Sequence, residues 1–139
     1  MSGICVTDGY QVYHTLEKER EDLRIAGCWA HARRRFDEAL QALPKDQQKD
    51  TIAYFALKQI QAIYREENKL EGMSAQERLK NRQLTVKPLV DAYFIWVKKT
   101  YNYFEYLLTE IPKHMDDRDN HFCEDLLPWS DKLPAECRK

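Results

Sequence analysis

Asp8 is a candidate metal ligand, because it follows a short β-favouring segment and precedes a glycine (ICVTDG). A carboxylate at the end of a strand is held rigidly at the rim of a sheet, where it can coordinate a divalent cation. The same residues also fit a turn in which Asp8 bonds to its own backbone, which is the more common outcome. A metal site for phosphoryl transfer would need further carboxylates from distant parts of the sequence.

Cys28 and His31 form a second group of reactive side chains, in the segment GCWAHARRRFDEAL. Their spacing offers two ligands to one ion, whereas a structural zinc site normally takes four. His121 and Cys123 are the other closely spaced pair that would complete such a site. The poor spacing of that second pair favours the alternative, a buried thiol and a hydrogen-bonded histidine at a strand-to-helix junction.

Arg33, Arg34 and Arg35 are candidate contacts to nucleic-acid phosphates. Consecutive helical residues are 100° apart, so the three cannot all line one groove, and one or two would hold phosphates. The alternative is a solvated helix face with Asp37 and Glu38 as local partners. Cations in a first helical turn oppose the helix dipole, which weakly favours a functional role over a stabilising one.

Strand and helix signals alternate in the N-terminal part of the chain. A strand is expected over residues 4–7, a helix over 10–24 with the charged run EKERED facing water, a strand over 25–30 and a helix over 32–43. This order places Asp8 and Cys28 near the ends of the two strands.

Beyond Pro44 the sequence predicts long helices. Apolar residues at three- and four-residue spacing indicate helices over 47–70 and from Pro88 to residue 111, which would pair antiparallel. Ser74 and Glu77 match a capping box for a shorter helix between them. Core packing would account for Tyr93, Trp96 and Phe104, whereas the other aromatic residues of the last helix suit an interface with another subunit or domain.

The expected fold is therefore mainly α, with two short N-terminal strands, a long antiparallel helix pair and an irregular acidic tail. The domains would be residues 1–43, 44–111 and 112–139.

Composition excludes several protein classes. The 139 residues are 43% apolar and 32% charged, as in an ordinary globular domain, and the net charge of −1 provides no global attraction to nucleic acid or an anionic membrane. No apolar run approaches the roughly 20 residues of a membrane-spanning helix, and no signal-peptide pattern is present. The four scattered cysteines suit reduced thiols. We therefore expect a cytoplasmic protein that does not associate with membranes.

Three blocks together resemble bacterial transposases of the insertion sequence 66 family: VTDGYQVY, GCWAHARRRFDEAL and IQAIYREENKLEGMSAQERLKNRQ. The resemblance covers about residues 3 to 100. It implies a ribonuclease-H-like fold that cuts and joins DNA through an Asp-Asp-Glu triad holding two magnesium ions. Asp8 would match the second aspartate of the triad, and Cys28 and His31 a Cys-x-x-His signature on the next strand. Residues from about Pro44 onward would be a helical insertion.

The chain departs from the family pattern in its other two acids. The first aspartate of the family lies upstream of the position of Asp8, and the glutamate belongs to a downstream motif that the tail does not show. The chain is therefore expected to be an internal fragment or truncated copy, inactive in strand transfer by itself, with magnesium and transposon-end DNA bound by the full-length parent.

Two other functions stay open at this point. One is a non-catalytic helical interaction module, from a decayed transposase, that forms a homodimer through its aromatic helices. The other is a zinc-binding module built on Cys28 and His31.

Overall fold

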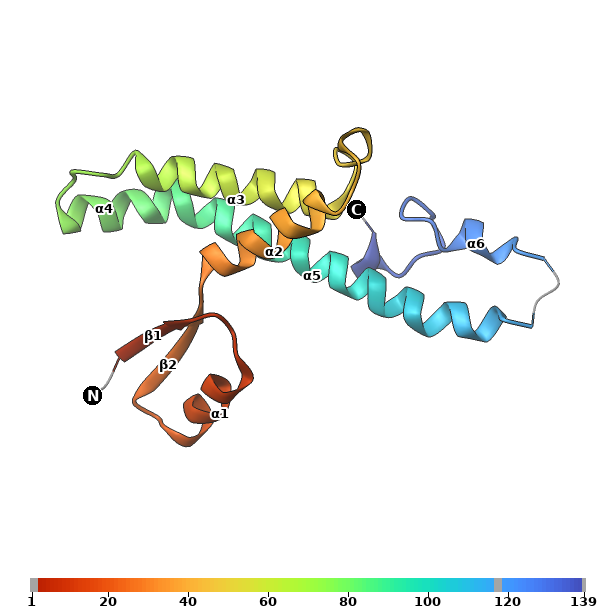
Figure 1. Ribbon diagram of the computed structural model, residues 1–139, viewed down its shortest axis with the longest axis horizontal. Coiled ribbons are helices and arrows are strands. Elements are labelled where there is room, and N and C mark those ends of the chain that lie inside the picture. The colour runs from red at the N-terminus through yellow and green to blue at the C-terminus, as the bar shows by residue number, and fades with distance from the viewer. Residues whose placement is uncertain (1–2, 117–118, 139) are drawn as a thin grey trace. The chain divides into compact units, whose positions relative to one another are not determined.

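The computed structural model of the chain describes residues 3–116 and 119–138, which are mostly helical (Figure 1). Two compact units are formed by Met1–Arg65 and Glu66–Lys139. Parts of the expected first domain (residues 1 and 2) and of the expected tail (117, 118 and 139) lie outside the described residues. None of the helices in the described ranges has the length and apolar character needed to cross a membrane.

A parallel pair of strands begins the first unit. β1 (Gly3–Thr7) pairs with β2 (Leu23–Gly27), from Gly3 opposite Leu23 to Thr7 opposite Gly27. Parallel neighbours need a crossover, and α1 (Gln11–Glu19) provides it. The second strand was expected over residues 25–30 but begins two residues earlier, at Leu23, and ends at Gly27. It cannot extend to residue 30 because the next helix already begins at Trp29.

Glu17 in α1 corrects the expectation that the whole charged run EKERED faces water. Its Oε1 accepts a hydrogen bond from the backbone N–H of Ile25 at 2.9 Å, and its side chain is half-buried. The carboxylate thereby satisfies a strand N–H on the edge of β2 that does not face β1.

Two helices complete the first unit. α2 (Trp29–Gln41) ends beside Gln48, whose Nε2 donates to the carbonyl oxygens of Leu40 at 2.9 Å and Leu43 at 3.0 Å. After a short 3-10 turn (Lys45–Gln47), α3 (Ile52–Asn68) runs across the unit boundary. Of the apolar stripe expected on this helix, Ala56, Ile60 and Ile63 are buried, whereas Ile52, Phe55 and Tyr64 are exposed.

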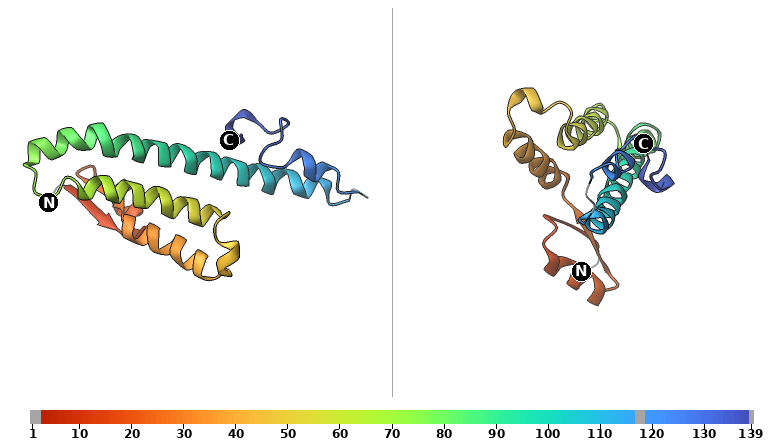
Figure 2. Two further views of the ribbon diagram at one scale, coloured as in Figure 1. Left: turned by 90° about the horizontal axis from the view of Figure 1, so that it is seen from above. Right: turned by 90° about the vertical axis from the view of Figure 1, so that its right-hand side faces the viewer.

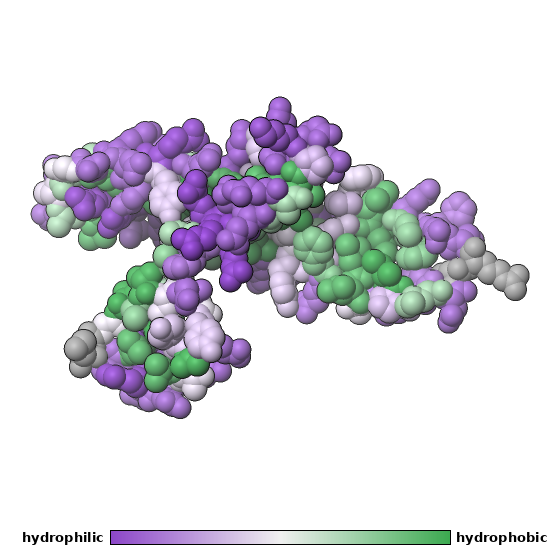
Figure 3. All heavy atoms as spheres, in the orientation of Figure 1, coloured by the Kyte–Doolittle hydropathy of each residue, from purple (hydrophilic) through white to green (hydrophobic). Residues whose placement is uncertain are grey.

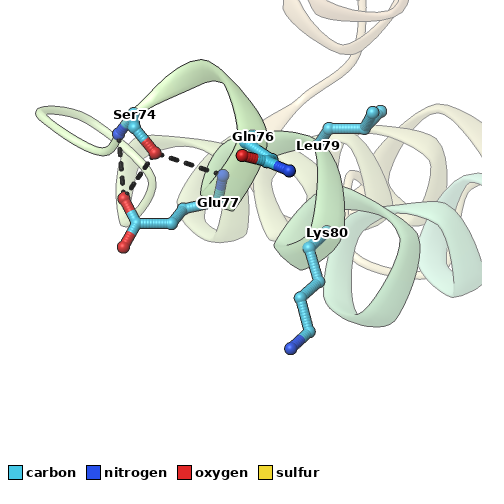
Figure 4. A pocket seen from close by; sticks show the side chains of 5 residues that line it. All are labelled: Ser74, Gln76, Glu77, Leu79 and Lys80. Atoms are coloured by element: carbon cyan, nitrogen blue, oxygen red, sulfur yellow. Dashed lines mark hydrogen bonds between the residues drawn. The ribbon is translucent and has the colours of Figure 1, made fainter.

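The first helix that lies wholly within the second unit begins with the predicted capping box. The Ser74 hydroxyl oxygen accepts from the Glu77 N–H at 3.3 Å, while Glu77 Oε2 accepts from the Ser74 N–H at 3.1 Å (Figure 4). This arrangement starts α4 (Ala75–Asn81), directly after Gly72, whose φ of 82° suits glycine.

α4 continues without a chain reversal through a π-helical turn (Arg82–Val86) into α5 (Lys87–Glu110), as Figure 2 shows. In the turn the Lys87 N–H donates to the Arg82 carbonyl oxygen, five residues back. Pro88 follows directly and has no N–H to donate to the preceding turn, so the α-helical hydrogen-bond pattern is interrupted where the wider turn lies. The predicted start of a helix near Pro88 is therefore a change of helix type rather than a new helix after a loop.

The expected irregular tail holds only short helical segments: 3-10 turns at Ile111–His114 and Ala135–Cys137, and α6 (Phe122–Asp125). It nevertheless packs within the second unit. Leu126, Leu133 and Cys137 are buried, and the Tyr103 hydroxyl donates to the Leu126 carbonyl oxygen at 2.8 Å.

The aromatic residues of α5 differ in part from expectation. Tyr93 is buried and Trp96 half-buried, as predicted for core residues. Phe104, also expected in the core, is 45% exposed, whereas Tyr103 is half-buried through its contact with the tail. The mainly helical class and the two parallel N-terminal strands are confirmed. The three-domain division, the ribonuclease-H-like core and the antiparallel helix pair stay predictions.

Candidate functional site

The carboxyl ends of β1 and β2 bring Asp8 and Cys28 to one edge of the sheet. Thr7 and Gly27 are partners in the register, and the Cys28 N–H donates to the Thr7 carbonyl oxygen at 2.8 Å. Asp8 follows Thr7 directly, so the two candidate residues continue from paired strand ends. In open α/β sheets this carboxyl edge is where ligands bind.

The Asp8 carboxylate is exposed and is oriented by a local turn. Its Oδ1 accepts a hydrogen bond from the Tyr10 N–H at 3.1 Å, and Gly9 has a φ of 85°, which favours glycine. Asp8 therefore both follows the end of a strand and bonds to the backbone of its own turn, so the two alternatives drawn from the sequence do not exclude each other. The turn fixes the carboxylate at the rim and leaves it accessible to solvent.

Cys28 is the N-cap residue of α2. Its thiol does not form a capping hydrogen bond of normal geometry, yet it lies beside helix donors that stabilise a thiolate. The N–H of His31 is the largest cause, followed by the His31 imidazole and the N–H of Ala30, and together they lower the pKa of the Cys28 thiol. The junction of strand and helix is as expected, but the thiol is half-buried rather than fully buried.

His31 is exposed in the first turn of α2. Cys28 and His31 belong to the first unit, and His121 and Cys123 to the second. No group of three or more Cys, His, Asp or Glu side chains suited to a metal ion occurs in residues 3–116 and 119–138. All four cysteines are free thiols.

The three arginines are exposed, but they do not lie in the first turn of α2. The helix begins at Trp29, so Arg33, Arg34 and Arg35 follow that turn, and the argument from the helix dipole no longer applies to them. Asp37, expected as a local partner, accepts a hydrogen bond from Gln41 Nε2 at 2.8 Å. α2 begins at the carboxyl edge of the sheet, and the three arginines follow its first turn. Because they are consecutive, they point in different directions around the helix.

Thr7 contributes to this edge although the sequence interpretation did not single it out. It is buried, its carbonyl oxygen binds the Cys28 N–H, and its Oγ1 accepts from the Gly9 N–H at 3.3 Å. The signal available in the sequence was its position as the last strand residue before Asp8, where a hydroxyl can serve the turn.

The model of the family described as "Transposase IS66 family" matches residues 1–117 of the chain. The chain belongs to the IS66 transposase family. This family assignment confirms the resemblance carried by the blocks around Asp8 and Cys28.

Curated relatives of this IS66 family chain come from Sinorhizobium fredii (strain NBRC 101917 / NGR234). Uncharacterized protein y4jD is 31% identical over 94 residues, which are 64% of this chain and 17% of the relative. Uncharacterized proteins y4qI and y4hP are each 32% identical over 70% of this chain and 19% of the relative. The chain thus spans less than a fifth of the length of the relatives it matches. No solved structure matches the chain.

The donor set at the carboxyl edge fits magnesium only in part. Asp8 supplies the hard oxygen ligand that magnesium prefers, whereas the thiol of Cys28 and the imidazole of His31 suit softer metals. A two-metal site needs several carboxylates, and Asp8 supplies one of them.

Proposed function

We propose that this chain is the part of an IS66 family DNA transposase that carries its second catalytic aspartate, Asp8. Its parent would cleave DNA and transfer strands with magnesium held jointly by Asp8 and carboxylates supplied from elsewhere in the longer protein. The observation that carries the proposal is the position of an exposed, turn-oriented Asp8 at the carboxyl edge of a parallel strand pair, in a chain of this family.

The exposed side chains of β1 support a larger sheet in the parent. Ile4 is 75% exposed and Val6 is 63% exposed, although both lie in a strand. A two-stranded sheet is not independently stable and gains burial when further strands and helices cover it. We therefore infer that β1 and β2 are two strands of a ribonuclease-H-like sheet completed by other segments.

The role proposed for Asp8 is tested in the parent transposase. Asp8→Asn keeps the shape of the side chain but removes the charge that binds the metal, so cleavage of transposon-end DNA should fall to background while DNA binding persists. Asp22→Asn is the matched control, because Asp22 is exposed beside β2 and pairs with Arg20 instead. Retained cleavage in Asp8→Asn would show that Asp8 is not a catalytic ligand.

The isolated chain is proposed to be inactive. With one carboxylate at the edge, it should produce no magnesium-dependent nicking of supercoiled DNA above a buffer control. Nicking that disappears in Asp8→Ala would contradict this proposal.

The arginines are proposed as DNA backbone contacts. Each phosphate contact contributes about 1 to the slope of log affinity against log salt concentration, so Arg34→Ala should lower that slope by about 1 if Arg34 holds a phosphate. Arg33→Ala and Arg35→Ala identify which of the three makes the contact. Lys49→Ala, an exposed cation in the same unit, is the control. Unchanged slopes in all three arginine variants would remove α2 from the interface.

A second candidate function, a helical module that self-associates, is favoured by the exposed apolar side chains of α5. Dimerisation of a chain that has no DNA affinity would support it over the first proposal.

A further inference from the structure

Apolar side chains recur along one line of α5 at alternating intervals of four and three residues. This spacing is the a/d pattern of a coiled coil, in which such residues of one helix pack between those of another. The line, here named the α5 seam, continues past the helix end through the following 3-10 turn (Ile111–His114) to the residue after it. Its members are Phe94, Val97, Tyr101, Phe104, Leu108, Ile111 and Met115.

The C-terminal half of the α5 seam is open to solvent. Tyr101 is 64% exposed, Leu108 76% and Met115 79%, and Phe104 and Ile111 are also exposed. Figure 3 shows apolar side chains gathered over the part of the chain that holds α5 and the segment after it. Apolar residues scattered on a surface need no explanation, but a continuous line at heptad spacing marks a helix-binding surface.

We propose that the α5 seam binds the α5 seam of a second copy of this chain, as an antiparallel two-helix coiled coil. A two-fold symmetric contact requires a surface that is complementary to itself. The α5 seam meets this requirement in one alignment. When Tyr101 lies opposite Phe104 of the second copy, Val97 lies opposite Leu108 and Phe94 opposite Ile111, and the same layers repeat by symmetry.

Charged residues beside the α5 seam favour the antiparallel direction. Lys98 and Glu105 each follow a d position of the seam, and both are exposed. In the antiparallel alignment Lys98 of one copy lies near Glu105 of the other, twice per dimer. A parallel alignment would place these two residues opposite Tyr93 and Thr100, which carry no complementary charge.

The contact surface is tested by sedimentation of the full chain over a range of concentrations. We expect a concentration-dependent dimer, which Leu108→Glu converts to a monomer because it buries a charge in the layer that Leu108 forms with Val97 of the second copy. Ile95→Glu is the matched control: Ile95 lies on the same helix and is 61% exposed, but it is not part of the α5 seam. Far-UV circular dichroism of both variants checks that the helices persist.

The direction of the helices is tested by exchanging the charges. Lys98→Glu and Glu105→Lys should each weaken the dimer several-fold, and the double variant should restore it, because the opposite charges then meet again across the interface. Absence of recovery in the double variant would overturn the antiparallel alignment.

Two other results would overturn the proposal as a whole: a wild-type chain that stays monomeric at high micromolar concentration, or a dimer that survives Leu108→Glu. Either outcome leaves the proposed role of Asp8 untouched, because that role is measured by DNA cleavage in the parent protein.

Discussion

Cys28 shows how the chemistry of a residue depends on its position at a helix start. The same residue type occurs buried at position 137, where desolvation raises the pKa of the thiol, with smaller contributions from Glu136 and Glu105. At Cys28 the neighbouring N–H groups of α2 act in the opposite direction. Two thiols of one chain are thus expected to differ in reactivity.

Alkylation measures this difference. A lowered pKa gives Cys28 a larger thiolate fraction below the ordinary thiol pKa, and the thiolate is the nucleophile. Near neutral pH, Cys28 should react with iodoacetamide several-fold faster than Cys137, and the reaction of Cys28 should begin at lower pH. His31→Ala removes only the imidazole contribution and should slow Cys28 partly. Peptide mass spectrometry measures the alkylation rate of each cysteine. Equal rates for Cys28 and Cys137 would contradict the prediction.

The residues of the candidate site were predictable from their types and order, but their surroundings were not. Asp8 and Cys28 could be placed at strand ends because apolar runs precede them. The position of the arginines within α2 was wrong by part of a turn, because helix starts are poorly marked when the N-cap is a cysteine without a capping hydrogen bond. Glu17 was assigned to water because its contact with Ile25 depends on how α1 folds back on β2.

At the scale of elements, α4 depends on its capping box more than on burial. It has seven residues and none of them is buried, so the hydrogen bonds between Ser74 and Glu77 fix where it begins. The Ser74 hydroxyl also lowers the pKa of Glu77. The pair was recognised from the sequence because a capping box is a local pattern that needs no tertiary information.

Removal of the cap has a measurable cost. Ser74→Ala should lower the free energy of unfolding by about 0.5–2 kcal/mol, the usual range for loss of an N-cap. Urea denaturation followed by circular dichroism measures the change. Gln76→Ala, an exposed position in the same helical turn, is the control and should have little effect. Equal stability of Ser74→Ala and the wild type would show that α4 does not need its cap.

α3 depends instead on burial. Ile60 has no exposed surface, whereas Ile52 on the same helix is 41% exposed. Ile60→Ala should therefore cost roughly 2–5 kcal/mol of unfolding free energy, because it removes buried methyl groups and leaves a cavity. Ile52→Ala should cost clearly less in the same denaturation experiment. A similar loss at both positions would mean that Ile52 is buried in solution.

At the scale of the whole molecule, a nearly neutral charge is combined with much exposed apolar surface. The isoelectric point is about 6.4, and exposed apolar side chains occur on β1, α1 and α5. The apolar content of 43% is that of an ordinary globular domain, and the chain forms two compact units. Composition gives the number of apolar residues but not which of them are packed against other parts of the chain. It therefore could not show that apolar side chains are exposed on β1, α1 and α5.

Solubility should follow from this combination. Association of the purified chain, followed by light scattering, should be strongest near pH 6.4, where net charge no longer opposes it. Ile4→Lys should reduce the scattering, because a charge on an exposed strand discourages strand-to-strand association. Scattering that does not vary with pH would indicate that charge repulsion is not what keeps the chain in solution.

The π-helical turn Arg82–Val86 joins α4 and α5 without a break between them. Such a turn contains one more residue than an α-helical turn, and each residue of an α-helix advances about 100° around its axis. Because the wider turn takes up this extra residue, deleting one residue there should return the turn to α-helical geometry and leave the faces of α5 nearly in place. Deleting one residue inside α5 would instead rotate everything beyond it by about 100°. The π-helical turn therefore accommodates one residue without altering which α5 side chains share a face, and it also contributes to packing, because Val86 within it is buried.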